Sequence, residues 1–519
     1  MKKYPETPIR HAPKGLCPIS SHPTGDSASN RRVSTRVYDV IVVGAGISGL
    51  LSALALSKEG NSVLVIEKTK FIGGNCRTYE VNDTGYFVDS GVHAVTCLKN
   101  GPLVTLMNKY FSIVPKFVPH GHYYVRDEKS LKKFPNTFQD LVRFSFLPRK
   151  EKLILSKLVI EAMARMSQLK KTDVSVYDYV QKYAFSEHTL RFLDAVSYFL
   201  SGVSMKETPV WRIITGGGLI EENEHRLHKK ITNIARIAIN STYEEQGYPR
   251  GGIGNLVHCI LHSASKNMKV QTSEKVIKIR RTGKSFVVQT SKESYTSGMV
   301  VYSAEAKKLA EVADMPAKWA ASAKKIRQSK SITLWLGLKK PLKSFSYKGS
   351  EVWFRSGVSY WAMPVSNYDS CLTPKGKQLV GFSTFMPYEE DAAAYEKKLL
   401  ETIYSAIPEV KGNIEMKHVQ IMVPEKGAVS VGVKFPPVNT PIKNLYLVGT
   451  DADMRSMGIT RASYSVVEML KIYNSKKTKT RKTKNTSQSR YQRELLQPLA
   501  DIRQRLPASM ARVRQGLRQ

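Results

Sequence analysis

One segment near the N-terminus constrains the fold more than any other part of the chain. Between residues 38 and 67, a β-branched run leads into a glycine turn, an apolar helix-forming run and a second apolar run that ends in an acid. A strand, a glycine turn, a helix and a strand in this order are typical of a dinucleotide-binding βαβ unit. We therefore expect an α/β fold with a Rossmann-like domain.

Each glycine of this turn has a separate physical role. Gly44 permits the tight turn, Gly46 lets the backbone approach a pyrophosphate, and Gly49 lets the helix pack closely on the sheet. The pyrophosphate then lies at the positive N-terminus of the helix. Glu67, which lies 18 residues beyond Gly49, is placed to accept hydrogen bonds from an adenosine ribose. The expected cradle consists of Gly44, Ala45, Gly46, Ser48, Gly49 and Glu67.

A paired glycine and an arginine follow the ribose acid. Gly73, Gly74 and Arg77 suit a second close approach of the backbone to a bound dinucleotide. The same fingerprint serves NAD and FAD, so a flavin-free NAD(P) dehydrogenase is an alternative at this point.

Further segments follow in an order that resembles a known family. With residues 86–93 added, the sequence resembles the FAD-dependent amine oxidase, phytoene desaturase and protoporphyrinogen oxidase superfamily. The resemblance covers roughly residues 38–472. It continues through the segments 248–256, 276–279, 299–304, 444–451 and 458–462.

The resemblance implies FAD as the cofactor and a glutathione-reductase-like FAD-binding domain, with an α+β substrate domain inserted in segments. The choice among Thr450, Asp451 and Asp453 as the ribityl contact stays open. Arg461 stands where the family commonly has small residues, and would bring a charge close to the isoalloxazine. Beyond the cradle, the implied cofactor contacts are Lys68, Gly73, Gly74, Arg77, His93, Val276, Gly449, Thr450, Asp451, Gly458 and Ile459.

The order of the motifs predicts how the chain is divided. We expect residues 102–240 to be mostly helical and residues 330–435 to be rich in strands. The predicted divisions are a basic N-terminal extension (1–36), FAD-binding parts (37–101, 241–310 and 436–475), substrate-domain parts (102–240 and 311–435) and a basic tail (476–519).

A flavin carries its own reactivity, so the protein needs no metal or nucleophile for the reaction. We interpret His120 and His122 as packing or surface residues, because no third ligand is near, and Cys76 as a packing residue. Lys330, just before an expected strand, resembles a lysine that holds a water near the flavin in some amine-oxidising relatives, although a surface role is favoured. Aromatic residues that could line an apolar substrate cavity, or form sheet core instead, are Tyr360, Trp361, Trp353 and Phe385.

The leading hypothesis is an FAD-dependent oxidoreductase that removes hydride from a C–C or C–N bond of an apolar substrate. A carotenoid or other isoprenoid precursor is favoured, on the strength of the segments around Gly251 and Gly337 and of the chain length. Protoporphyrinogen oxidation and amine oxidation are the alternatives on the same scaffold, since function depends on the substrate cavity. The sequence does not identify the electron acceptor or the oligomeric state.

The net charge of +37 concerns partners rather than the fold. Residues 1–36 hold seven Lys and Arg against two acids, and residues 476–519 hold thirteen against two. A basic, partly apolar segment at 138–166 could rest on an anionic membrane or be an ordinary packed helix. We expect a cytoplasmic or peripheral membrane protein without specific nucleic-acid binding. Open alternatives are an organellar transit segment at residues 1–36 and an interaction role for the tail.

Overall fold

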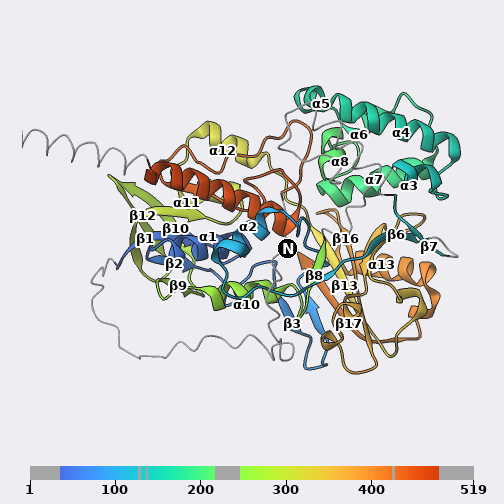
Figure 1. Ribbon diagram of the computed structural model, residues 1–519, viewed down its shortest axis with the longest axis horizontal. Coiled ribbons are helices and arrows are strands. Elements are labelled where there is room, and N and C mark those ends of the chain that lie inside the picture. The colour runs from blue at the N-terminus through green and yellow to red at the C-terminus, as the bar shows by residue number, and fades with distance from the viewer. Residues whose placement is uncertain (1–35, 127–129, 136–137, 217–245, 423–426, 479–519) are drawn as a thin grey trace, which may run out of the picture. The chain divides into compact units, whose positions relative to one another are not determined.

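A computed structural model describes residues 36–126, 130–135, 138–216, 246–422 and 427–478 (Figure 1). Across these residues the fold is a mixed α/β fold with two seven-stranded sheets. Within the same residues, no helix has both the length and the apolar character needed to cross a bilayer. The predicted N-terminal extension except Arg36, and the tail from residue 479, lie outside this part of the chain.

The first sheet contains the expected strand, turn and helix. Its central strand β1 pairs in parallel with β2 on one side and with β12 on the other, and β9 follows β2. One side of β12 also pairs with β18 in parallel and with β11 antiparallel. Strands from distant parts of the sequence therefore share one sheet. They are β1 Arg36–Val43, β2 Val63–Ile66, β9 Met268–Gln271, β10 Val276–Thr282, β11 Ser285–Thr290, β12 Ser294–Tyr302 and β18 Leu445–Leu447.

Helix α1 (Ile47–Lys58) runs through the interior beside this sheet, and all its residues from Ser48 to Ser57 are buried. Because a helix buried on every side needs no polar stripe, its sequence is apolar and small throughout. It packs on β2, on α2 and on α10. The other helices of this region are α2 Pro102–Tyr110, α10 Gly254–Ser263, α11 Ala306–Val312, α12 Ala317–Lys324 and a helix over residues 458–478.

The second sheet has the order β17-β13-β16-β15-β14-β6-β7 and is antiparallel except between β14 and β6. One face packs on helix α13 (Ala392–Ala406), through alternate residues such as Leu334 and Phe382. The opposite face covers residues 86–92. The strands are β6 His122–Arg126, β7 Leu131–Lys133, β13 Ser331–Leu338, β14 Gly349–Trp353, β15 Tyr360–Met363, β16 Gln378–Phe385 and β17 Ile414–Met422.

The expectation of a mostly helical region at 102–240 holds for residues 149–216 and is wrong for residues 117–133, which form β5, β6 and β7. The run His122–Arg126 is rich in aromatic and β-branched residues, which favour strands once a neighbouring strand is available. Here β14 supplies that neighbour. Residues 217–245 lie outside the described part.

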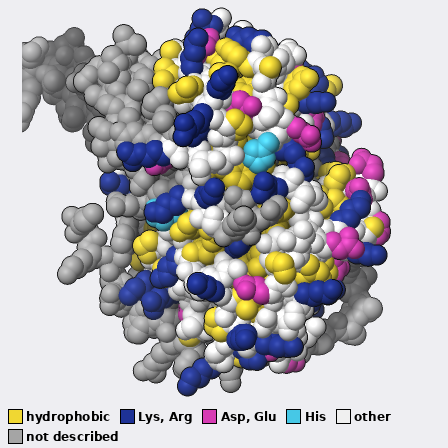
Figure 2. Space-filling view, turned by 90° about the vertical axis from the view of Figure 1, so that its right-hand side faces the viewer, with side chains coloured by type: hydrophobic (Ala, Val, Ile, Leu, Met, Phe, Trp, Pro, Cys, Tyr) yellow, Lys and Arg dark blue, Asp and Glu magenta, His cyan; other side chains and the backbone are white. Residues whose placement is uncertain are grey.

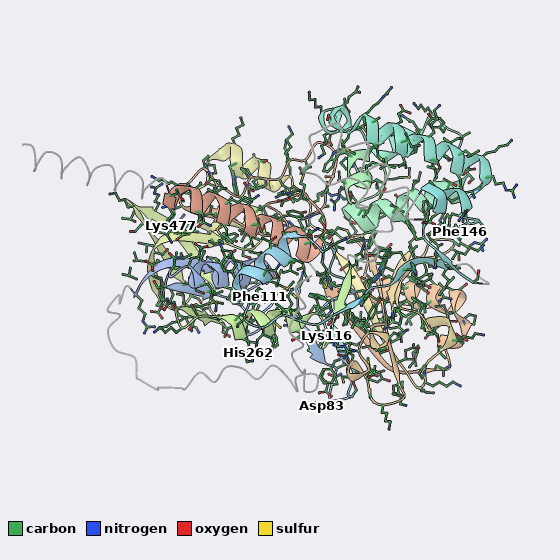
Figure 3. All side chains as sticks on the ribbon, viewed as in Figure 1. Asp83, Phe111, Lys116, Phe146, His262 and Lys477 are labelled. Atoms are coloured by element: carbon green, nitrogen blue, oxygen red, sulfur yellow. The ribbon has the colours of Figure 1, made fainter. Side chains whose placement is uncertain are left out.

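The helical group α3–α8 packs against the β6–β14 end of the second sheet. Phe146 (Figure 3) joins the two, because its ring centroid lies 4.9 Å from that of Phe354. Ser175 and Ser186 cap α6 and α7 by accepting hydrogen bonds from backbone N–H groups. The group consists of α3 Phe138–Arg143, α4 Arg149–Ala164, α5 Met166–Thr172, α6 Val176–Val180, α7 Glu187–Ser201 and α8 Val210–Gly216.

Short elements complete the structure. Strands β3 and β4 form a hairpin that carries residues 78–89, and β5 pairs with β8. Their bounds are β3 Thr78–Glu80, β4 Phe87–Asp89, β5 Phe117–Pro119 and β8 Gly247–Pro249. The 3-10 turns are η2 Lys343–Phe345, η3 Val365–Asn367, η4 Ser370–Leu372 and η5 Pro408–Val410.

Candidate functional site

The turn between β1 and α1 has the geometry of an anion cradle. Gly44 adopts a φ of +99°, and a Cβ there would lie 2.6 Å from the backbone oxygen of Ser303. A Cβ at Gly49 would overlap the carbonyl oxygen of Gly44, so this position tolerates only glycine. A Cβ at Gly46, by contrast, would meet no atom within 4 Å. The backbone is therefore tight on the sheet side and open where a phosphate would approach.

Among the described residues, no side chain caps the N-terminus of α1. Gly46 caps the helix without a side-chain hydrogen bond, and the first turn contains no acidic residue. The first N–H groups of a helix have no intrahelical acceptor, and they favour a negative charge. The hydroxyl of Ser48 lies beside them and shares a hydrogen bond of 2.8 Å with the hydroxyl of Ser303.

Glu67 joins the end of β2 to the glycine turn. Its Oε2 accepts a hydrogen bond from the Ala45 N–H at 2.9 Å, and its Oε1 accepts from the Thr69 N–H and hydroxyl at the same distance. The carboxylate is 9% exposed, so it is held in one orientation at the edge of the cradle. Lys68, the next residue, points into solvent.

The paired glycines pack directly on the cradle. Gly73 donates its N–H to the Ala45 carbonyl at 2.8 Å, and a Cβ at Gly74 would lie 3.2 Å from the Gly46 Cα. Two glycine segments separated by α1 and β2 thus face each other across the same space. Arg77 stacks on the ring of Phe71, with its guanidinium 4.4 Å from the ring centroid.

Asp89 is a buried carboxylate that links four elements around this site. The hydroxyls of Thr78 and Tyr248 each donate to it at 2.6 Å, and the Ile253 N–H donates at 3.0 Å. Burial raises the pKa of Asp89, although these donors oppose the effect. Asp89 is not among the cofactor contacts expected from the sequence. The available signal was an acid that ends an apolar strand, Phe87–Asp89.

A second turn closes the cradle from the end of β18. Gly449 has a φ of +123° and donates its N–H to the Ser465 hydroxyl at 2.8 Å. A Cβ on Gly449 would lie 3.5 Å from the Ser48 hydroxyl, so this turn borders the α1 N-terminus. Thr450 is partly exposed beside it, whereas Gly458 and Ile459 begin the helix of residues 458–478.

The three open candidates for the ribityl contact differ in their surroundings. Asp451 is 4% exposed, and its Oδ2 accepts from the Ala306 N–H and from Gln328 at 2.9 and 2.8 Å. Asp453 forms an ion pair with Arg455 at 2.6 Å. Burial raises the pKa of Asp451. Its carboxyl group joins the residue 451 turn to the segments that contain Ala306 and Gln328. Thr450 is therefore the candidate that combines partial exposure with a position next to Gly449.

Arg461 is fully buried, and it is directed toward backbone carbonyls. Its guanidinium donates to the carbonyls of Gly427 and Ser456 at 2.8 and 3.1 Å. A second buried arginine, Arg212 of α8, donates to the Met454 carbonyl at 3.0 Å and also to Ser456. Two positive charges therefore fix the loop that precedes residue 458. Sequence reasoning missed Arg212, since no motif surrounds it.

Val276 and Lys330 differ in their relation to the cradle. Two residues before Val276, the Glu274 N–H donates to the Glu67 carbonyl at 2.9 Å. Val276 is buried at the start of β10, where it pairs with Thr290. The ammonium of Lys330 donates to the carbonyls of Tyr388 and Glu390 at 3.2 and 3.4 Å. This geometry ties Lys330 to the 388–390 loop and gives it no contact with the glycine cradle.

The second sheet separates Tyr360 from Trp361, two of the four aromatic residues proposed for the substrate cavity. Tyr360 points to the α13 side, where it is 2% exposed and belongs to the core with Phe382. Trp361 points to the opposite side, toward the helical group, and stacks on Phe199 of α7 with ring centroids 3.8 Å apart and planes at 7°. The period of two in a strand allows only one of two consecutive residues to face the site. Trp353 shares the α13-side core.

The face that carries Trp361 has a row of neutral polar residues. Trp361 lies opposite Ser383, Ser383 opposite Thr333, and Thr333 opposite Gln420 on four adjacent strands. The next row contains Phe385, whose ring stacks on that of Tyr198 of α7 with the centroids 6.4 Å apart. None of the described strand residues on this face is Asp or Glu. This face, which we name the substrate face because it carries the sequence-predicted Trp361, has a neutral row over β15, β16, β13 and β17 and is bordered by aromatic rings. The same row continues through Val352 and Val125 to the charged Lys132 of β7.

Residues 91–93 connect the substrate face to the cofactor region. Gly91 donates its N–H to Gln420 Oε1 at 2.9 Å, and a Cβ on Gly91 would lie 3.1 Å from the Met422 sulfur and 2.9 Å from His93 Cε1. Gln420 in turn donates to the Asp89 carbonyl at 2.8 Å. His93 Nδ1 is buried and has no hydrogen-bond partner among the described residues. Buried polar atoms are nearly always hydrogen-bonded, so this nitrogen is positioned to contact a bound ligand.

Other candidate features lie apart from this arrangement. Cys76 is buried and directs its thiol to the Ile253 carbonyl, and burial raises its pKa, which is consistent with packing. His120 is buried against Tyr368, whereas His122 is partly exposed. In the described part of the chain, no group of three or more His, Cys, Asp or Glu could hold a metal ion.

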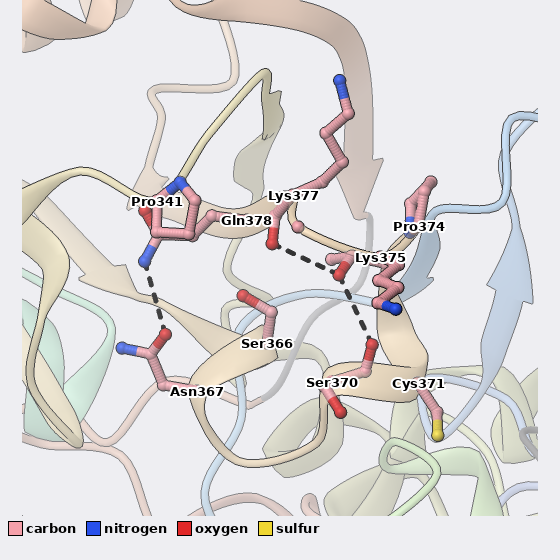
Figure 4. Close-up of a pocket in the computed structure, with 11 residues that line it drawn as sticks. Pro341, Ser366, Asn367, Ser370, Cys371, Pro374, Lys375, Lys377 and Gln378 are labelled. Atoms are coloured by element: carbon pink, nitrogen blue, oxygen red, sulfur yellow. Dashed lines mark hydrogen bonds between the residues drawn. The ribbon is translucent and has the colours of Figure 1, made fainter.

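A polar surface pocket of about 470 Å³ lies at the opposite end of the second sheet (Figure 4). Its lining includes Asn367, Lys377 and Gln378, and the Gln378 amide donates to Asn367 at 3.3 Å. Gln378 pairs with Leu338 at the end of β13 remote from Ser331. The pocket is thus separate from the substrate face near Trp361.

The fold and the cradle together define a dinucleotide-binding α/β protein. Over residues 47–455 the chain matches the sequence model of the flavin containing amine oxidoreductase family, and it belongs to that family. It is accordingly an FAD-dependent oxidoreductase. The open space at Gly46 and the α1 N-terminus, which no described side chain caps and whose first turn has no acid, fit the pyrophosphate of FAD.

Individual relatives match shorter stretches or share the fold. An uncharacterized protein in the nifH2 3′ region of Methanothermococcus thermolithotrophicus is 55% identical over 96 residues, which are 18% of this chain and 90% of that protein. An all-trans-retinol 13,14-reductase of Rattus norvegicus is 41% identical over 63 residues, 12% of this chain and only 10% of that reductase. The crystal structure of an oxidoreductase from Methanosarcina mazei has a TM-score of 0.67 at 19% identity, covering 83% of this chain and 99% of that one.

Proposed function

We propose that this FAD-dependent oxidoreductase removes hydride from a C–C bond of an apolar substrate, with an isoprenoid or other polyene as the substrate class. The substrate face carries this proposal. Its row of Trp361, Ser383, Thr333 and Gln420 is neutral, and its border is formed by Trp361, Phe199 and Phe385. Among the described residues no carboxylate stands in that row to balance a cation, and the charged side chain at its β7 end, Lys132, is itself a cation. Burying an unpaired charge is costly, whereas a flat apolar molecule packs favourably on aromatic rings.

The protein orients the substrate, excludes water from the substrate face and accepts the proton that the substrate loses. When bound, FAD supplies the hydride acceptor. Trp361 and Phe199 present a flat apolar border, and Thr333 and Ser383 offer hydroxyls at the centre of the face. We assign His93 Nδ1 as the atom that accepts the proton lost with the hydride, because it is an imidazole nitrogen near this face that has no hydrogen-bond partner among the described residues.

The arrangement of the first sheet supports a glutathione-reductase-like FAD-binding domain. Five of its strands, β9, β2, β1, β12 and β18, are parallel neighbours, and the cradle lies at the carboxyl ends of β1 and β18. Ligands of open parallel sheets bind at such ends. We propose that the adenosine lies toward Glu67 and that the flavin extends toward Gly449 and residues 91–93.

Amine oxidation is the second candidate, because the family model describes amine oxidoreductases. Anaerobic mixing with a substrate panel distinguishes the two. We expect a polyene or isoprenoid precursor to bleach the flavin, and a primary amine or protoporphyrinogen not to do so. Bleaching by the amine alone would overturn the apolar proposal and leave the FAD assignment intact.

The FAD site itself can be tested with a matched pair of glycines. Gly46→Val fills the space expected for the pyrophosphate, whereas Gly412→Val adds the same side chain at another position with no atom within 4 Å. We expect the first variant to lose most bound FAD, read from its visible spectrum, and the second to keep it. Equal FAD content in the two would refute the proposed cradle.

A further inference from the structure

Helix α4 (Arg149–Ala164) exposes a face that mixes apolar and basic side chains. Leu153 is 61% exposed and Ile160 is 48% exposed, which places both among the large apolar side chains left outside the core. Arg149, Lys150 and Lys157 are exposed on the same helix. We name the set of Arg149, Lys150, Leu153, Lys157, Ile160 and Ala164 the basic–apolar face.

These residues form one stripe along the helix. Successive residues of an α-helix are about 100° apart, so the six side chains fall within an arc of about 100°. Leu153, Ile160 and Ala164 occupy its middle, with Arg149 on one edge and the two lysines on the other. The buried apolar residues Leu155, Leu158 and Ala162 lie on the opposite side of the helix.

The basic charges on this face are not balanced locally. None of the side chains of Arg149, Lys150 and Lys157 forms an ion pair with an acid in the described residues. The two acids of the helix are engaged elsewhere: Glu151 accepts from the Ser186 N–H and hydroxyl at 3.1 and 2.9 Å, and Glu161 pairs with Arg165 at 3.2 Å. Figure 2 shows apolar side chains bordered by Lys and Arg at the top of the molecule.

We propose that the basic–apolar face binds an anionic phospholipid surface, with Leu153 and Ile160 inserted at the interface and the three cations near the headgroups. An apolar stripe flanked by basic residues is the pattern of a helix that lies in the membrane interface. Long basic side chains can keep their charges in the headgroup layer while their stems cover apolar surface. A second copy of the chain fits poorly, since face-to-face pairing would bring like charges together.

The same helical group also borders the substrate face. Helix α4 packs on α8, α8 packs on α7, and α7 supplies Phe199 to Trp361 and Tyr198 to Phe385. A membrane attached at α4 would place the group that lines the substrate face next to a phase in which apolar molecules dissolve. This location agrees with the proposed function, although lipid binding through α4 does not require it.

The test compares full-length variants by co-sedimentation with vesicles of phosphatidylcholine, alone or mixed equally with phosphatidylglycerol. We expect the parent chain to prefer the anionic vesicles. The double variant Leu153→Ser/Ile160→Ser should bind them at least about tenfold more weakly, because it removes buried apolar surface. Lys150→Gln/Lys157→Gln should weaken binding about twenty-five-fold at low salt, at about fivefold per basic residue.

Ile277→Ser is the matched control, because Ile277 is also 48% exposed but lies on β10 of the first sheet. It also controls for binding through the basic terminal segments, which every variant retains. FAD content and melting temperature confirm that each variant is folded. The proposal fails if the α4 double variant binds within twofold of Ile277→Ser, or if it changes only the oligomeric state in light scattering. Vesicle binding without turnover of any apolar substrate would reject the proposed function alone.

Discussion

The two sheets of this protein depend on different kinds of information. In the first sheet, the cradle is built by Gly44, Gly46 and Gly49, whose roles follow from their positions in one short turn. In the second sheet, the substrate face is a row in which Trp361, Ser383, Thr333 and Gln420 come from four strands. The cradle is thus a local feature of the backbone, while the substrate face exists only after long-range strand pairing.

A substitution at Gly49 tests the local origin of the cradle most directly. A local view predicts that Gly49→Ala stabilises α1, because alanine has the higher helix propensity by about 1 kcal/mol. The structure predicts the opposite, since the new Cβ would overlap the backbone oxygen of Gly44. We expect a loss of about 5 kcal/mol, at the upper end for single substitutions, or failure to fold. Chemical denaturation measures it.

Gly298→Ala is the control for that substitution, because its Cβ would lie 3.6 Å from the Asp39 oxygen, an ordinary contact. The same sheet should tolerate this change. If both variants were equally stable, the cradle would be less tightly packed than described.

In the second sheet, the largest expected effect concerns a buried ion pair. Arg126 Nε donates to Glu351 Oε1 at 2.7 Å, and Tyr347 donates to the same carboxylate at 2.9 Å. Glu351→Gln leaves the Arg126 charge buried without its counterion, which costs about 3–5 kcal/mol. We expect reduced stability in denaturant melts with unchanged FAD content in the folded fraction.

The double variant Arg126→Met/Glu351→Gln sharpens this prediction. It removes the isolated charge, so part of the lost stability should return. A double variant that is no more stable than Glu351→Gln would show that the carboxylate acts through its tyrosine contacts instead.

A pH effect of intermediate size is expected from His120. Burial lowers the pKa of His120 to about 4, and its Nε2 shares a hydrogen bond of 2.8 Å with Ser350. The unfolded chain therefore binds more protons between pH 4 and 6.5, so stability falls as the pH drops through that window. From pH 7 to pH 5 the loss is about 2 kcal/mol.

His120→Gln isolates this contribution. The difference between parent and variant in unfolding free energy should shrink by that amount over the same pH range, while contributions from all other groups cancel. A parallel pH dependence in the two proteins would mean that His120 does not remain neutral in the folded state.

The smallest effects separate the two neighbours on β15. Tyr360→Phe removes a long hydrogen bond of 3.4 Å to Glu351 on the α13 side, and should cost about 1 kcal/mol of stability without changing KM. Trp361→Leu should instead raise KM for the substrate that the enzyme oxidises, at unchanged FAD content. If Tyr360→Phe also raised KM, the assignment of opposite faces would be wrong.

Within the cofactor region, the sequence alone predicted site residues that lie close together in the chain. It did not predict residues that remote segments contribute. Glu67 was found from its distance to Gly49. Arg212 was not, because its contact with the Ser456 carbonyl joins α8 to a loop more than two hundred residues later. Arg461 was noticed as an unusual charge, but only its packing showed that it serves the backbone carbonyls of Gly427 and Ser456.

The amino-acid sequence alone determined the βαβ cradle and the family, because glycine spacing and strand and helix propensities act over a few residues. Tertiary structure decided which side chains share the substrate face. Strand alternation directs Trp361 and Tyr360 to opposite sides, and only the pairing of β15 with β16 and β14 establishes which side is the core. It likewise revealed that Leu153 and Ile160 stay outside the core, since exposure depends on what the rest of the chain covers.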